Sequence, residues 1–114
     1  MNITTSQQGT VTTVAISGSV DSLSADSLTE SFAGEVNAGR VKLVADFSTV
    51  SYTSSAGLRS LLAAVKDSRR LGGDLRIAAA QPDVLRVLSL SGFTSIIKIF
   101  DTVDAAVASY GQAA

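Results

Sequence analysis

The sequence contains no cysteine and no histidine, and it has only one proline. Without cysteine there is no disulfide, thiolate nucleophile or sulfur-ligated metal, and without histidine the commonest general base and metal ligand is missing. A Ser-His-Asp triad is impossible, and the acidic residues are not clustered as a carboxylate metal site would need. We therefore expect a protein that is not an enzyme, that needs no cofactor and no metal, and that acts by binding or switching.

Charge is also scarce, because charged residues make up 17% of the chain and leave a formal net charge of −1. Such a chain has no basic field to attract nucleic acid or anionic lipid. Apolar runs such as 61–65 are far shorter than the roughly 20 residues of a membrane span, and the first residues, MNITTSQQ, do not resemble a signal peptide. We expect a cytoplasmic protein that binds neither nucleic acid directly nor a membrane.

The pattern of apolar residues predicts one α/β domain. The 114 residues, 46% of them hydrophobic, are enough to bury one core, and we place the domain at 1–110 and a short tail at 111–114. Strand-forming residues on both sides of Gly9 predict an antiparallel hairpin, after which helical and strand patterns alternate. Alternation calls for a mostly parallel sheet covered by about four helices, and the hairpin makes that sheet mixed.

The expected elements follow from apolar spacing and from the residues at their ends. In chain order they are strands at 3–7 and 11–20, a helix carrying Leu28, Phe32 and Val36 that ends near Gly39, a buried central strand at 41–47, a helix at 55–71, a strand around 75–79, a short helix from Pro82 to Gly92, a last strand at 96–100 and a helix capped by Thr102. Ser22 or Ser24 is the expected N-cap of the first helix.

The serine pair Ser54 and Ser55 lies where the central strand leads into a helix. A serine at this place usually caps the helix by accepting a hydrogen bond from a first-turn amide, which contributes about 1 kcal/mol. Ser54 is the expected cap, which leaves Ser55 with a hydroxyl held at the surface. The first turn has no Asp or Glu, so the positive helix end is free for an external anion such as phosphate.

Two neighbours of the serine pair bear on this interpretation. Gly57 costs the helix about 0.5–1 kcal/mol relative to alanine, so it either lets another backbone approach or packs against the sheet. Arg59 lies four residues after Ser55 on the same helix face, within reach of a phosphate there. With Lys66 and Arg70 it forms a basic stripe, which is either a solvated face or a surface for an acidic partner.

Four segments resemble the STAS domains, and specifically the bacterial anti-sigma factor antagonists. They are Gly18-Ser19-Val20-Asp21, Val44-Ala45-Asp46-Phe47-Ser48, Tyr52-Thr53-Ser54-Ser55-Ala56-Gly57-Leu58 and Leu88-Ser89-Leu90-Ser91-Gly92-Phe93. The resemblance covers nearly the whole chain and implies a partner switch. The unphosphorylated protein would bind an anti-sigma factor that is also a serine kinase and so release sigma factor, phosphorylation would break the complex, and a PPM-type phosphatase would restore it.

The resemblance also implies roles for single residues. Aligned on Gly57, Ser55 is the phosphoacceptor. Asp21 and Asp46 match acidic positions near the phosphosite, with turn and strand-end hydrogen bonding as their alternative role. The expected partner-binding residues are then Asp21, Asp46, Ser54, Gly57 and Arg59. The residue before the acceptor is usually aspartate in the family and is Ser54 here, which makes Ser54 a rival acceptor.

Two other functions are compatible with the sequence. STAS-like domains have been proposed to bind nucleotides or lipids, and the helix start at 54–57 could hold an anion directly. The chain could also be a constitutive subunit of a transporter or signalling complex that uses the same surface without phosphorylation.

Overall fold

The computed structural model describes residues 1–111, so the expected tail at 111–114 lies outside the described residues except for Gly111. In chain order the elements are β1 (Asn2–Gln8), β2 (Val11–Val20), α1 (Ala25–Asn37), β3 (Lys42–Thr53), α2 (Ser55–Arg70), β4 (Asp74–Ala78), α3 (Pro82–Leu90), the 3₁₀ helix η1 (Phe93–Ser95), β5 (Ile99–Phe100) and α4 (Val103–Ala108). Within this part of the chain, the predicted α/β fold with four α-helices is confirmed.

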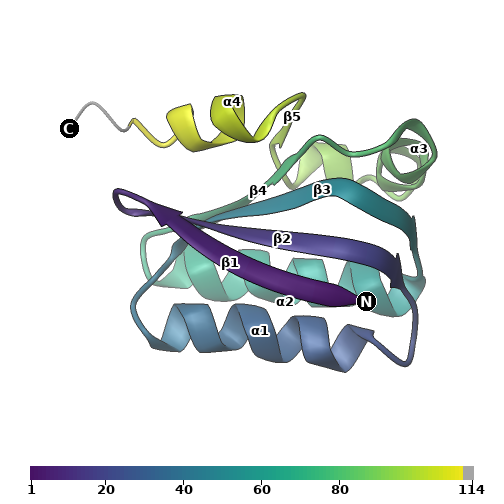
Figure 1. The fold of residues 1–114 in the computed structure, drawn as a ribbon, viewed down its shortest axis with the longest axis horizontal. Coiled ribbons are helices and arrows are strands. Elements are labelled where there is room, and N and C mark those ends of the chain that lie inside the picture. The colour runs from purple at the N-terminus through teal and green to yellow at the C-terminus, as the bar shows by residue number, and fades with distance from the viewer. Residues whose placement is uncertain (112–114) are drawn as a thin grey trace.

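The five strands form one mixed sheet in the order β1-β2-β3-β4-β5. The predicted hairpin is confirmed, because β1 pairs antiparallel with β2 and Gly9 adopts the positive φ of 62° in the turn between them. The other neighbouring strands are parallel, and β3 is central as predicted. Helices α1 and α2 lie on one side of the sheet and α4 lies on the other (Figure 1).

The main core lies between the sheet and the helices α1 and α2. Leu28, Phe32 and Val36 of α1 are buried there, which confirms the helical face that their spacing predicted. The predicted helix ends also hold, since Gly39 and Gly72 follow α1 and α2 with φ of 87° and 90°. Glycine adopts this left-handed conformation without steric cost, so it ends a helix cleanly.

The central strand continues past its predicted end at residue 47 to Thr53. Its second half, 48–53, contains polar residues, a composition that predicts the end of a strand. These residues stay extended because β2 continues beside them, with Gly18 opposite Val50 and Val20 opposite Thr53, and register shifts along β2 accommodate the longer β3. The extension carries the strand directly to Ser54.

The last strand is shorter than predicted. Only Ile99 and Phe100 pair with β4, whereas Ile96 and Ile97 lie in a turn after η1. Their backbone amides donate to the Phe93 carbonyl at 2.9 and 2.8 Å, which keeps them out of the sheet. The period of the apolar residues suits either structure, so the sequence did not separate the turn from the strand.

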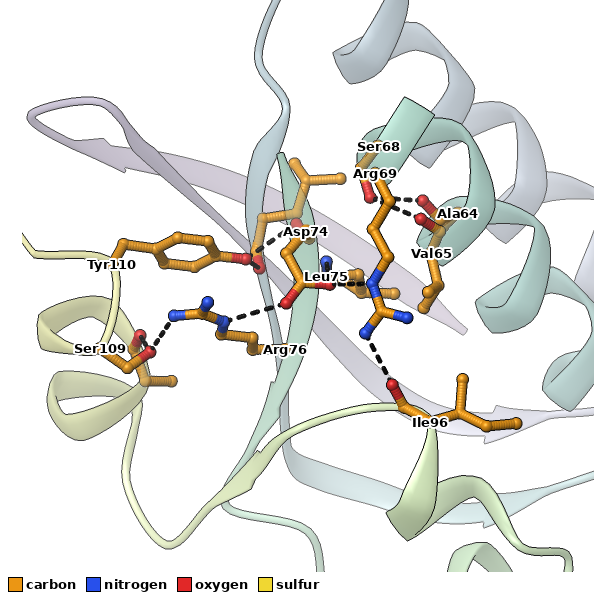
Figure 2. A network of polar contacts seen from close by, with 12 residues as sticks. Ala64, Val65, Ser68, Arg69, Asp74, Leu75, Arg76, Ile96, Ser109 and Tyr110 are labelled. Carbon is orange, nitrogen blue, oxygen red and sulfur yellow. Dashed lines mark hydrogen bonds and ion pairs between the residues drawn. The ribbon is translucent and has the colours of Figure 1, made fainter. Parts of the chain in front are cut away.

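A second, smaller core lies between α4 and the sheet and includes Val11, Val44 and Val107. The predicted cap of α4 is confirmed, because the Thr102 hydroxyl accepts from the Ala105 amide at 3.1 Å. Beyond the helix, the Tyr110 hydroxyl lies 2.7 Å from the Leu43 carbonyl oxygen and 2.8 Å from that of Asp74, which joins the end of the chain to two strands (Figure 2). Across residues 1–111, no helix has both the length and the hydropathy that a bilayer crossing requires.

Candidate functional site

The serine pair lies where the carboxyl ends of β2 and β3 meet the start of α2. The Ser54 amide donates to the Val20 carbonyl at 2.8 Å, which ties the end of β3 to the end of β2. Ser54 is extended, and its hydroxyl accepts a hydrogen bond from the Gly57 amide at 3.2 Å. The prediction that Ser54 caps the helix is therefore confirmed.

Ser55 is the first residue of α2, and its side chain is exposed. Within residues 1–111, no hydrogen bond to its hydroxyl is found. The first turn of α2 contains no acidic residue. A free hydroxyl thus lies at the positive end of a long helix, on a backbone held by the sheet.

Gly57 is buried against the ends of the two strands. A Cβ atom at this position would lie 2.5 Å from the Thr53 Oγ1 atom and 2.8 Å from the Val20 Cγ1 atom. The packing alternative for Gly57 is confirmed, because the missing side chain lets α2 approach the strands that carry Ser54. Its expected role in binding a partner stays a prediction, and such a role would act through the position of α2.

We expect Gly57→Ala to lower the free energy of unfolding by about 1–3 kcal/mol, since the new methyl group overpacks the contact with Val20 and Thr53. Gly34→Ala is the matched control. Gly34 lies inside α1, and a Cβ atom added there would have no other atom within 4 Å, so alanine should stabilise the protein by about 0.5–1 kcal/mol. Urea denaturation followed by circular dichroism measures both, and a stabilised Gly57→Ala variant would contradict the packing role.

Arg59 is exposed and lines a surface hollow of about 350 Å³ between the starts of α1 and α2. The two helices are joined beneath it by a contact of 2.6 Å between the Thr29 and Ser60 hydroxyls. The described residues include no ion-pair partner for Arg59. Arg70 of the same helix does have one, because its Nη2 atom lies 3.8 Å from the Asp67 Oδ1 atom. Of the predicted basic stripe, Arg59 is the member close to Ser55.

Asp21 caps the turn between β2 and α1. Its carboxylate accepts from the amides of Leu23 and Ser24, both at 3.0 Å, and the Asp21 amide donates to the Ser24 hydroxyl at 3.0 Å. Hydrogen bonds from the Ser24 amide and hydroxyl lower the pKa of Asp21 below its usual value. Ser24 occupies the N-cap position as predicted, but it forms no side-chain cap bond of its own, and Asp21 satisfies the amides of this turn instead.

Asp46 does not lie near the serine pair, so that expectation is wrong. Asp46 lies opposite Ala15 and Ala78 in the sheet, and its carboxylate accepts from the Ser48 amide at 3.0 Å. The strand runs on from there to Thr53, a distance on the order of 20 Å. Asp21 remains close to the site because it follows Val20, whereas Asp46 has the local hydrogen-bonding role given as its alternative.

Two exposed side chains at the same end of the sheet, those of Leu23 and Tyr52, were not predicted from the sequence. Leu23 is 90% exposed in the β2–α1 turn, and Tyr52 is 53% exposed near the end of β3. Tyr52 pairs with Ser19 across the sheet, and Ser19 lines a hollow together with Leu23. A leucine within the polar segment DSLS was the available signal for the first, and large exposed apolar groups often anchor protein partners.

Comparison with known families decides what kind of domain this is, since the STAS domain family matches residues 2–106. The chain belongs to the STAS domain family. Over 98 residues this STAS protein is 35% identical to BtrV of Bordetella bronchiseptica, which is named as an anti-sigma factor antagonist. The alignment covers 86% of this chain and 84% of BtrV.

Solved structures of STAS proteins share the fold. An anti-sigma factor antagonist from Mycobacterium paratuberculosis superimposes with a TM-score of 0.87 at 25% identity, over 95% of this chain and 92% of that one. SpoIIAA in its unphosphorylated form superimposes with a TM-score of 0.75 at 11% identity, over 97% and 98% of the two chains. The phosphorylated form of SpoIIAA from Bacillus gives 0.75 at 14% identity, over 96% and 99%. At such identities SpoIIAA shows the fold alone.

Proposed function

We propose that this STAS protein is an anti-sigma factor antagonist that works as a phosphorylation-controlled partner switch. Its unphosphorylated form binds a cognate anti-sigma factor that is also a serine kinase, and sigma factor is thereby released. Phosphorylation of Ser55 ends the binding, and a PPM-type serine phosphatase restores it. The name of BtrV supports the role of antagonist, and the exposed Ser55 hydroxyl at the start of α2 supports the switch.

The observation that carries this proposal is the difference in hydrogen bonding between the two serine hydroxyls. The Ser54 hydroxyl is engaged with the Gly57 amide, whereas the Ser55 hydroxyl is exposed at the first position of α2. A kinase can reach the Ser55 hydroxyl without breaking a cap, and transfer to Ser54 would remove the cap. The geometry therefore favours Ser55 over its rival as the acceptor.

A phosphate on Ser55 suits its surroundings electrostatically. It adds about −1.5 to −2 charges near pH 7 at the positive end of α2, whose first turn contains no acidic residue. Arg59, one helical turn further on, is free to pair with it. Phosphorylation should therefore change the surface that a partner meets and leave the fold intact.

The exposed side chains on the surface around Ser55 are of the types found in protein interfaces. The exposed side chains of Leu23 and Tyr52 offer apolar anchors, and Arg59 offers a charged one. Apolar and arginine side chains of this kind carry much of the energy of protein binding. A partner that buries Leu23 and Tyr52 covers Ser55 as well if it spans the ends of β2 and β3.

The phosphoacceptor can be tested by incubating the purified protein with its anti-sigma kinase and ATP. We expect one phosphate per chain by intact mass, located on Ser55 by peptide mapping and lost in Ser55→Ala. Ser54→Asn is the matched control, because asparagine caps a helix about as well as serine but offers no hydroxyl. Labelling of Ser54→Asn should match the wild type.

Two results would contradict the proposal in different ways. Labelling that persists in Ser55→Ala and disappears in Ser54→Asn would move the acceptor to Ser54. An absence of any labelling, together with saturable binding of GTP, ATP or lipid by the isolated protein in calorimetry, would support the ligand-binding alternative.

A further inference from the structure

Strand β1 forms an open edge of the sheet. It pairs with β2 on one side, and no other strand of the described chain lies beyond it. Figure 1 shows β1 as the foremost strand of the sheet, with α1 below it. Every residue of β1 is exposed except the partly buried Ile3. An open edge carries unpaired amides and carbonyls that can pair with another strand.

This edge lacks the features that usually protect an open strand. The seven residues of β1, NITTSQQ, include no charged residue and no proline. The β1–β2 register is continuous, without a bulge. The opposite edge is protected, because β5 has only two residues, both partly buried, and Lys98 directly precedes it. The contrast within one sheet sets β1 apart as an edge suited to pairing.

The flank of α1 beside this edge consists mainly of small side chains. Ser27 lines the same surface hollow as Asn2 and Ile3, whereas Thr29 contacts α2 through Ser60. At 100° per residue, the residues of α1 within about 60° of Ser27 are Ser31 and Gly34, with Glu30 at the limit of this range. The α1 residues nearest to Ser27 around the helix are therefore small and uncharged, and Glu30 is the one charged residue at the border of this flank.

We infer that β1 binds β1 of a second copy of this chain, antiparallel, about a twofold axis at Thr5. In this register Thr5 faces its own copy, Thr4 faces Ser6, Ile3 faces Gln7 and Asn2 faces Gln8. A symmetric interface sets the residue on the axis against its own copy, so a charge at Thr5 would repel itself. An uncharged edge is what self-pairing requires, whereas a different partner would tolerate charge and often use it.

Sedimentation equilibrium of the full chain, from about 10 µM to about 1 mM, tests this dimer. We expect a reversible dimer that Thr5→Lys weakens at least about 10-fold, because two like charges then meet on the axis. Thr5→Gln changes the size of this exposed side chain without charge and should dimerise within about 3-fold of the wild type. Circular dichroism checks that both variants keep the fold.

A cysteine assay checks that the interface lies at β1, and no native cysteine interferes because the chain has none. Under mild oxidation, Thr5→Cys should form a covalent dimer faster than Thr94→Cys, which places an exposed cysteine in η1, away from β1. A monomer throughout the concentration range would overturn the inference and leave the edge to a strand from another protein. A dimer that Thr5→Lys does not weaken would also overturn it, because the interface would then lie elsewhere.

Discussion

Phosphorylation of Ser55 is expected to lower the affinity of the protein for its anti-sigma factor by about 10²- to 10⁴-fold while leaving the fold unchanged. The loss follows from the place of the phosphate, at the end of the sheet that also carries the exposed side chains of Leu23 and Tyr52, where we propose that a partner binds and excludes water. A doubly charged group buried against a partner loses its hydration, and any acidic or phosphate group opposite repels it. The fold is unaffected because Ser55 is exposed and its hydroxyl has no structural bond within residues 1–111.

Calorimetry with the unphosphorylated and phosphorylated proteins measures this loss, and thermal unfolding of each measures the fold. Ser55→Asp carries about half the charge of the phosphate and should have an intermediate affinity. Thr94→Asp is the control for charge alone, because it adds the same charge at an exposed position in η1. Its affinity should stay near that of the wild type. Equal affinities for the phosphorylated and unphosphorylated proteins would exclude a switch at Ser55.

Asp74→Ala is expected to lower the free energy of unfolding by about 3 kcal/mol, because it removes the acceptor at the centre of a network of polar contacts. The Asp74 carboxylate accepts from the Arg69 Nε atom at 2.8 Å, the Arg76 Nε atom at 3.2 Å and the Leu75 amide at 2.9 Å (Figure 2). The side chains of Asp74 and Arg76 are each 11% exposed. Without the carboxylate, the Arg76 charge stays buried without its acidic partner.

The same change loosens the attachment of the end of the chain to the sheet. The Arg76 guanidinium lies 3.9 Å from the centre of the Tyr110 ring and donates to the Ser109 hydroxyl at 2.6 Å. Burial in this contact raises the pKa of Tyr110 well above its usual value, so its hydroxyl stays protonated and can donate to the strand carbonyls. Asp74 therefore helps to fix the Arg76 side chain, which contacts Ser109 and Tyr110 just beyond α4.

Asp67→Ala is the matched control for Asp74→Ala. Asp67 also pairs with an arginine, Arg70, but at 3.8 Å and with side chains that are 46% and 71% exposed. An ion pair in this setting contributes little, so we expect a change of less than about 0.5 kcal/mol. Urea denaturation of both variants compares them. Similar small losses in the two would show that solvent screens the Asp74 network as it does a surface pair.

Much of the fold followed from local patterns along the chain. Leu28, Phe32 and Val36 lie on one face of α1 because helical periodicity alone decides which side chains share a face. Gly9 and Gly72 were readable as a turn and a helix end because few other residues adopt a positive φ there. The errors came where a neighbouring strand decides the structure. Residues 48–53 stay extended because β2 pairs with them, and 96–97 leave the sheet because η1 holds them.

The features of the candidate site also separate into those that local sequence sets and those that the tertiary structure sets. The sequence by itself determined that Ser54 and Ser55 lie at a helix start without an acidic first turn, since capping depends on residues close in the chain. Only the tertiary structure decided that Gly57 packs on Val20 and Thr53, that Asp21 lies beside the site and Asp46 does not, and that Leu23 and Tyr52 are exposed there. These relations depend on strand register and burial, which join residues far apart in the chain. The open edge of β1 belongs with them, because strand order exists only in the assembled sheet.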